Sequence, residues 1–244
     1  MPLPIAHSMM GYAIAEVAEA ANVRLTNKKW LNVSIFVTLA NLPDCDFLPG
    51  FLLGEPNRYH QWFTHSLGFA FLAGLCGGLF YWRRQKQNKL QSAENPERFG
   101  LYGVFIGFAV LSHVVLDLLT WDSSPPKGMM LFWPFDKNHY DVRWDFFLAC
   151  RRDNASATFF SSLFSMYNLK VVLREFLIMA PIVGLAKIFE RLLALRRISR
   201  PVDIKDTQVA RLGLLEVSPL PVELANRRSL TALAEVAEQD EHEQ

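Results

Sequence analysis

The chain has 244 residues and a formal net charge of +1, so no strong electric field points to a charged macromolecular partner. Its basic residues form short clusters between apolar segments, and we therefore expect no binding to nucleic acid. Hydrophobic residues make up 51% of the chain, and they concentrate before the polar C-terminal part. This composition favours an integral membrane protein.

The three cysteines, Cys45, Cys76 and Cys150, lie far apart and include no CxxC pair. The sequence therefore suggests neither a disulfide framework nor a thiolate zinc site, although Cys45 remains a soft-ligand candidate.

We interpret the chain as one domain followed by a tail. Residues 1–200 are expected to form a membrane-embedded domain, and residues 201–244 a polar, partly disordered C-terminal tail. The expected fold class is all-α: a polytopic membrane helical bundle with short N-terminal helices and about four to five membrane-associated helices.

In chain order, residues 8–21 predict a short or interfacial helix with Ser8 as its N-cap. Residues 30–43 are uncharged but marginal in length for crossing a bilayer, which favours a tilted or half-buried helix. Asp44 and Asp46 follow between Pro43 and Pro49. Because helices tend to end before a proline, we expect both aspartates in an irregular turn.

Residues 66–82 contain no charge and predict a transmembrane helix. A second spanning helix is predicted over residues 99–121, where His113 and Asp117 are the only ionisable groups. The loop that follows, rich in proline and aromatics, is expected to lie at the membrane surface as a lid candidate. Residues 146–167 are expected at the interface, and residues 171–195 in another long helix with Pro181 inside it.

Metal-ligand chemistry is the strongest functional signal. Asp44, Asp46, His60 and His65 lie between apolar runs and resemble half of a metal site, while His113 and Asp117 share one helix face at i and i+4. Each residue alone is better explained as a capped turn or a hydrogen-bonded core residue. Together they indicate a metal site, and imidazole with carboxylate suits Zn, Mn or Fe better than Ca or Mg.

Topology predicts that the polar residues meet. If the basic turns within residues 24–29, 83–89 and 191–200 face the cytoplasm, then His7 and the six residues above all fall on the outer, periplasmic side. The loop over residues 122–170 also places basic residues on that side, so the absolute orientation stays open. That the seven residues share one side depends only on the number of crossings.

Four motifs in order carry a resemblance to a known family: PIAHS, NLPDCD, HQWFTHSLG and LSHVVLDLLT. Over about residues 1–190, the chain resembles the LexA-regulated, membrane-bound metal-dependent hydrolases of the bacterial inner membrane. The resemblance implies an inner-membrane hydrolase with a metal site at His7, Asp44, Asp46, His60, His65, His113 and Asp117. A more distant similarity is to zinc-dependent phospholipases C and related single-strand nucleases.

Two classes of function follow. The first is a metal-dependent hydrolase, phosphoesterase-like, that acts on a lipid or lipid-linked substrate with one or two divalent ions, Zn being favoured over Mn. The second is a non-enzymatic metal-binding membrane protein or ion transporter, in which polar residues should be spread through the bilayer. The clustering of the seven residues favours the hydrolase. The sequence singles out no catalytic acid or base, and it does not determine the oligomeric state.

Overall fold

The computed structural model describes residues 1–88, 99–121, 127–142 and 144–198. Within these residues the regular structure is helical, and β-pairing is limited to isolated bridges, in agreement with the predicted fold class. The α-helices are α1 (Pro4–Ala20), α2 (Lys29–Asn41), α3 (Phe47–Leu52), α4 (Leu67–Asn88), α5 (Phe99–Leu118), α6 (Phe159–Leu163) and α7 (Met166–Ile198). Three short 3₁₀ helices connect them: η1 (Leu42–Asp46), η2 (Pro56–Tyr59) and η3 (Phe63–His65).

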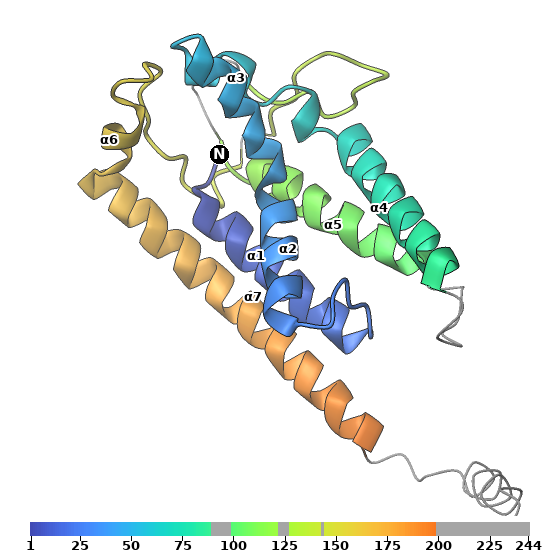
Figure 1. Cartoon of the computed structure of the whole chain (residues 1–244). Coiled ribbons are helices and arrows are strands. Elements are labelled where there is room, and N and C mark those ends of the chain that lie inside the picture. Colours follow the sequence, from blue (N-terminus) through green and yellow to red (C-terminus); the bar gives the residue numbers. More distant parts are fainter. Residues whose placement is uncertain (89–98, 122–126, 143, 199–244) are drawn as a thin grey trace, which may run out of the picture. The chain divides into compact units, whose positions relative to one another are not determined.

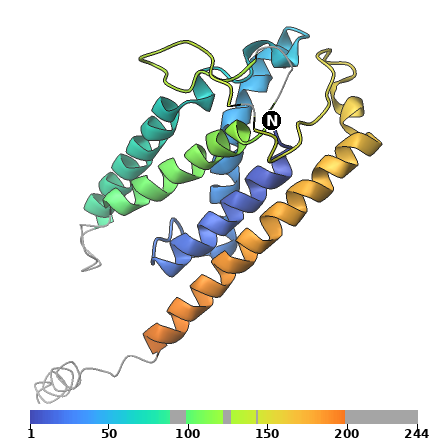
Figure 2. The same ribbon diagram turned by 180° about the vertical axis from the view of Figure 1, so that it is seen from behind.

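Residues Met1–Arg196 form one compact unit, in which α1, α2 and α5 pack on one another and α4 packs on α5. Helix α7 runs beside α1, and both views of the ribbon show the two helices side by side (Figures 1 and 2). Contacts at the start and in the middle of α1 show that the two helices run in the same direction: Glu175 accepts from the amide of Leu3, and the Lys187 ammonium lies over the Tyr12 ring. The predicted tail, residues 201–244, lies outside the described residues.

Small residues set the close spacing of the helices. A Cβ atom on Gly11 of α1 would lie 2.7 Å from the carbonyl oxygen of Phe36 in α2, and one on Gly74 of α4 would lie 2.8 Å from that of Gly103 in α5. Such small-residue contacts are typical of helix pairs in membranes, because lipid, unlike water, provides no hydrophobic driving force for helix association. Between these contacts the core is apolar, with Phe36 fully buried against α1 and α5.

Among the described residues, two stretches are long and apolar enough to cross a membrane, Lys29–Leu52 and Gly100–Leu118. The prediction of about four to five membrane-associated helices is therefore met only in part. Arg83 and Arg84 follow the apolar part of α4 directly and shorten it, while α7 carries Arg174, Glu175 and Lys187 within its apolar stretch.

Two expectations about local structure were wrong. The first helix begins at Pro4 rather than Ser8, because proline at the first helical position is already preset for the helix, so His7 lies inside α1. Asp44 and Asp46 lie in the 3₁₀ helix η1, which has Pro43 in its first turn, and not in an irregular turn. The segment 146–167, expected at the membrane interface, contains the short helix α6 and the start of α7, and its interfacial position stays a prediction.

Candidate metal centre

The seven predicted residues lie close together. They belong to the start of α1, to the segment from η1 to η3 and to the end of α5, which meet at the end of the bundle where the N-terminus lies (Figure 1). His7 lies in the second turn of α1, and His113 and Asp117 lie in the last turns of α5. Between them come the two aspartates of η1 and the two histidines around η3. All seven side chains are buried or nearly so, and Asp44 is the most accessible with 15% of its side chain exposed.

Four ligand-type atoms form the centre of the cluster. Nε2 of His65 lies 3.2 Å from Nε2 of His113, and 3.4 Å from Oδ2 of Asp117. Nε2 of His113 lies 3.6 Å from the same Asp117 oxygen. Oδ1 of Asp44 lies 3.4 Å from Nε2 of His113 and 3.7 Å from Nε2 of His65. Ligands at the bond lengths of a tetrahedral zinc ion are separated by about 3.3–3.6 Å, so these spacings fit one small divalent ion.

The protons of the two central histidines are fixed on the far side of each ring. Nδ1 of His113 donates to the carbonyl oxygen of Ala40 at 2.8 Å, and a carbonyl can only accept. Nδ1 of His65 lies 3.1 Å from Oδ2 of Asp46, which likewise accepts. In the neutral form of both rings, the two Nε2 lone pairs therefore point at each other. That arrangement needs a proton or a cation between them.

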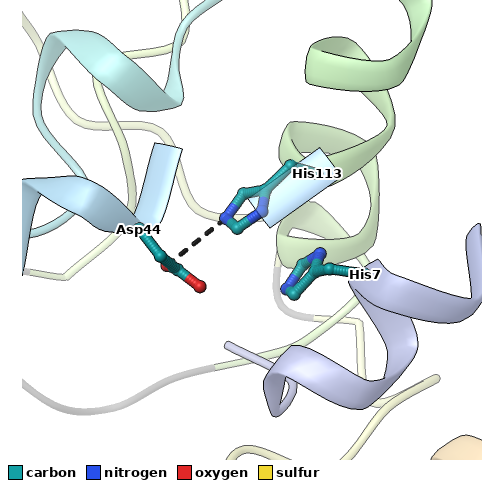
Figure 3. Close-up of side chains that lie close together, drawn as sticks. All are labelled: His7, Asp44 and His113. Carbon is teal, nitrogen blue, oxygen red and sulfur yellow. Dashed lines mark ion pairs between the residues drawn. The ribbon is translucent and has the colours of Figure 1, made fainter. Parts of the chain in front are cut away.

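His7 extends the cluster to a second position. Its ring stacks on that of His113 (Figure 3), with centroids 3.8 Å apart. Its Nε2 lies 3.5 Å from Oδ1 of Asp117. Because His65 and His113 face the other oxygen of the same carboxylate, Asp117 is placed to bridge two ions. His7, Asp44 and His113 also form a group of ligand atoms all within 4.8 Å of one another.

Asp46 differs from the other two aspartates because protein groups already occupy its oxygens. Oδ1 accepts from Nδ1 of His60 at 2.9 Å. Oδ2 accepts from the backbone amide of Gln61 at 3.0 Å and from the hydroxyl of Thr64 at 2.9 Å, and it also lies next to His65. This geometry is that of a residue that orients histidine ligands. Asp46 thus holds the rings of His60 and His65, whatever else it contacts.

The fit to a cation is tested by the buried polar atoms that the protein leaves without hydrogen bonds. Among the described residues, seven such side-chain atoms are found, and six belong to the cluster. They are both ring nitrogens of His7, Oδ1 of Asp44, Nε2 of His60, and both oxygens of Asp117. A buried carboxylate without hydrogen bonds is costly unless a cation compensates it. The donor set therefore suits a divalent ion, and the role of these residues as ligands stays a prediction.

His60 and His65, which lie outside the two candidate membrane spans, have pKa values shifted in opposite directions. Burial lowers the pKa of His60 to about 4, against the opposing effect of Asp46, so this ring is neutral near pH 7. Burial also acts to lower the pKa of His65, but its contacts with Asp117, Asp44 and Asp46 outweigh burial and raise that pKa well above its usual value. The three aspartates thus favour positive charge at His65.

The sequence interpretation missed Glu175, which supports the cluster from α7. Its side chain is fully buried, and its two oxygens accept from the backbone amides of Leu3 at 2.5 Å and Ala6 at 3.1 Å. These amides belong to the first turn of α1, where backbone donors have no partner within the helix. Glu175 therefore fixes the helix that carries His7. A charged residue in the apolar part of a membrane helix was the signal that could have revealed it.

The surface loop covers the cluster by residues other than those expected. We expected Trp133 to Phe135 to border the site, but Phe135 is 96% exposed and Trp133 packs on Phe63. Asp117 is instead bordered by the parts of the loop that precede and follow these residues. A small polar cavity there is lined by Gln61, Asp117, Leu118, Thr120, Gly128, Met129, Tyr140, Asp141 and Val142. Backbone pairing of Met129 with Tyr140 closes this part of the loop, which therefore lies against the Asp117 side of the cluster.

Comparison with known proteins gives a family for the chain. Searches of curated proteins and of solved structures returned no match. A family model described as YdjM inner membrane protein matches residues 1–193. The match supports the predicted inner-membrane location and carries neither an activity nor a mode of regulation, so hydrolysis and LexA control stay predictions. With most of its length matched, including all seven residues of the cluster, this chain belongs to the YdjM inner membrane protein family.

Proposed function

We propose that the protein is a membrane-bound, metal-dependent hydrolase of phosphoester bonds in a lipid or lipid-linked substrate. The observation that carries the proposal is the spacing of Nε2 of His65 and Nε2 of His113, which lie 3.2 Å apart and each 3.4–3.7 Å from one oxygen of Asp44 and one oxygen of Asp117. With the Nδ1 protons of both rings directed elsewhere, these atoms would hold one divalent ion, Zn before Mn.

A second ion would be held by His7 and by the other oxygen of Asp117. Divalent ions in such a site lower the pKa of water and stabilise negative charge on a phosphoryl oxygen. The chain itself contributes burial, which strengthens these electrostatic effects, and a rigid arrangement of the ligands through Asp46, Ala40 and Glu175. Neither ring nitrogen of His7 has a hydrogen bond within the protein, so either could bind a metal ion.

The alternative is a metal-binding membrane protein or ion transporter without enzymatic activity. A transport path requires polar groups along the depth of the bundle. Below the cluster, however, the interface of α1, α2 and α5 is filled by Ile14, Ala15, Phe36, Ile106 and Ala109, all of them buried and apolar. This apolar layer lacks the polar groups that a transport path would need. It therefore favours a site confined to one end of the bundle, and with it the hydrolase.

The test is metal analysis combined with hydrolysis assays on the detergent-purified full chain. We expect one to two equivalents of Zn or Mn, and metal-dependent cleavage of bis(p-nitrophenyl) phosphate or of phosphatidylglycerol that a chelator abolishes. A preparation that binds no metal and cannot be reconstituted would contradict both functions. Tight metal binding without cleavage of either phosphodiester would favour the non-enzymatic alternative.

A further inference from the structure

An apolar groove opens beside the metal-ligand cluster. Its walls are Pro49, Leu52 and Leu53 from the α3 segment, and Tyr59, Trp62 and Phe63 from the η2–η3 segment. Asp46 and Thr64 lie at its polar end, and both contact the histidines of the cluster. The cavity volume is about 680 Å³, within the range of small-molecule binding sites. The groove therefore leads from an apolar surface to Asp46 and Thr64, which contact His60 and His65 of the cluster.

The mouth of the groove has the composition of a surface in contact with lipid. Leu52 is 89% exposed and Leu53 55%, and the rings of Trp62 and Phe63 are also partly exposed. Leu52 ends the membrane-span candidate Lys29–Leu52, and tryptophan and tyrosine side chains are enriched where membranes meet water. A ligand that enters here would come from the bilayer.

The walls also restrict the chemistry of the occupant. Apart from the Cys45 thiol, the Tyr59 hydroxyl and the Trp62 indole N–H, the polar side chains that line the groove are Asp46 and Thr64, both at the end next to the cluster. A peptide bound along the walls would leave backbone amides and carbonyls without partners, which is costly in an apolar environment. A hydrocarbon chain has no such groups, and its polar head would reach the end where Asp46 lies.

We propose that this groove, referred to below as the α3 groove, binds one acyl chain of a phospholipid substrate and directs its phosphoester head to the metal centre. The proposal rests on the proposed function, whose substrate class it specifies. A second apolar groove, between α4 and α5, is lined by residues such as Phe71, Gly74 and Val104 and contains none of the seven cluster residues. It serves as an internal control for ordinary lipid contact.

The binding test uses a phosphatidylglycerol with a diazirine at the end of one acyl chain. The probe is added in substoichiometric amount to the full chain in detergent, photolysed, and mapped by peptide mass spectrometry. We expect labelling of the α3 groove that increases several-fold when the protein is loaded with Zn or Mn, because the metal holds the head group. Labelling of the α4–α5 groove should not depend on metal. Equal labelling of both grooves, or labelling of the α3 groove that ignores the metal, would overturn the proposal.

A matched pair of variants tests the same groove by activity. Leu53→Trp fills the groove, whereas Leu48→Trp adds the same ring to an exposed position on α3 that does not line it. We expect the rate with long-chain phosphatidylglycerol, relative to that with soluble bis(p-nitrophenyl) phosphate, to fall about tenfold in Leu53→Trp and to stay unchanged in Leu48→Trp. The same ratio in both variants would contradict the acyl-chain site.

The two proposals fail in different ways. If no phosphoester is cleaved but labelling of the α3 groove depends on metal, the hydrolase assignment fails and the lipid site stands. If both substrates are cleaved and Leu53→Trp changes neither labelling nor the rate ratio, the hydrolase stands and the lipid site fails.

Discussion

Acidic side chains are buried at both ends of the bundle, but the two ends differ in whether these side chains have hydrogen-bond partners. At one end Glu16 is 2% exposed, and its carboxylate accepts from the Lys29 ammonium at 3.0 Å. Beside it, Asn32 accepts from the amide of Thr26 at 2.7 Å and donates to its carbonyl at 3.1 Å. At the other end Asp117 is equally buried, and neither of its oxygens has a hydrogen bond. Similar burial thus comes with satisfied groups at one end and unsatisfied groups at the other.

The difference indicates what each end is for. Buried polar groups that serve the fold are paired by the protein itself, because an unpaired buried group lowers the free energy of unfolding. Glu16 and Glu175 follow this rule, one through a lysine and one through two backbone amides. The atoms of His7, Asp44 and Asp117 do not, because they face other cluster residues at 3.4–3.6 Å without a hydrogen bond. A cation that binds only the folded protein would offset this cost. Four predictions, ordered by their expected effect on metal affinity, test the comparison.

The largest effect is expected from the residues at the centre of the cluster. His113→Ala and Asp117→Ala should each weaken metal binding by more than about 100-fold, because both face the four-atom centre and Asp117 is placed to hold two ions. Metal content after gel filtration of the purified protein measures this loss, and hydrolysis should disappear with it. Leu118→Ala is the control on the same helix. Normal metal content in Asp117→Ala would show that the unpaired carboxylate is not a ligand.

Asp46→Asn should have a smaller effect of a different kind. The amide would keep one acceptor oxygen but could not accept from His60, Gln61, Thr64 and His65 together, so the imidazoles would be less well oriented. We expect metal affinity to fall about 10- to 100-fold with an unchanged stoichiometry. Asp44→Asn, which alters an unpaired oxygen, should instead lower the stoichiometry. Titration calorimetry distinguishes the two outcomes, and a lower stoichiometry in Asp46→Asn would make Asp46 a ligand.

These contrasts also show what the sequence could predict. The meeting of His7, Asp44 and His113 followed from counting helix crossings and from the i, i+4 spacing in α5, since helix ends on one side of a membrane lie at similar depth. The different roles of Asp44 and Asp46 could not be predicted in this way. Asp44 and Asp46 are two positions apart with similar neighbours, and only the three-dimensional contacts show that one is saturated by the protein and the other is not.

The tertiary support of the site was also beyond the sequence. Glu175 lies 172 positions from Leu3, and no local pattern connects a carboxylate in α7 with amides at the start of α1. Similarly, the apolar run before Arg83 predicted a span, but the sequence alone could not show how α4 packs on the glycines of α5. Long-range packing decides such contacts, and pattern and propensity describe only the segments themselves.

Glu175→Gln tests the support of α1 and should have a modest effect on metal. Glutamine offers one acceptor where the carboxylate offers two, so one of the amides of Leu3 and Ala6 loses its partner. We expect faster hydrogen exchange over the first turn of α1 and a loss of metal affinity of a few-fold, confined to the position that includes His7. Arg174→Gln, at the neighbouring position, is the control, because its side chain donates to the carbonyl of Asp145 and not to the start of α1. Unchanged exchange would exclude a positioning role for Glu175.

The smallest effect on metal is expected at the opposite end of the bundle. Lys29→Met removes the partner of the buried Glu16 carboxylate and should lower the free energy of unfolding by about 1 kcal/mol, a modest value because the lysine side chain is 53% exposed. Metal content and affinity should equal those of the wild type, because the apolar layer around Phe36 and Ile106 separates this pair from the cluster. Thermal unfolding and metal titration of the same preparation measure both quantities, with exposed Lys28→Met as the matched control. If Lys29→Met weakened metal binding while Lys28→Met did not, the two ends would be coupled through the bundle, and a polar path of the kind a transporter needs would have to be reconsidered.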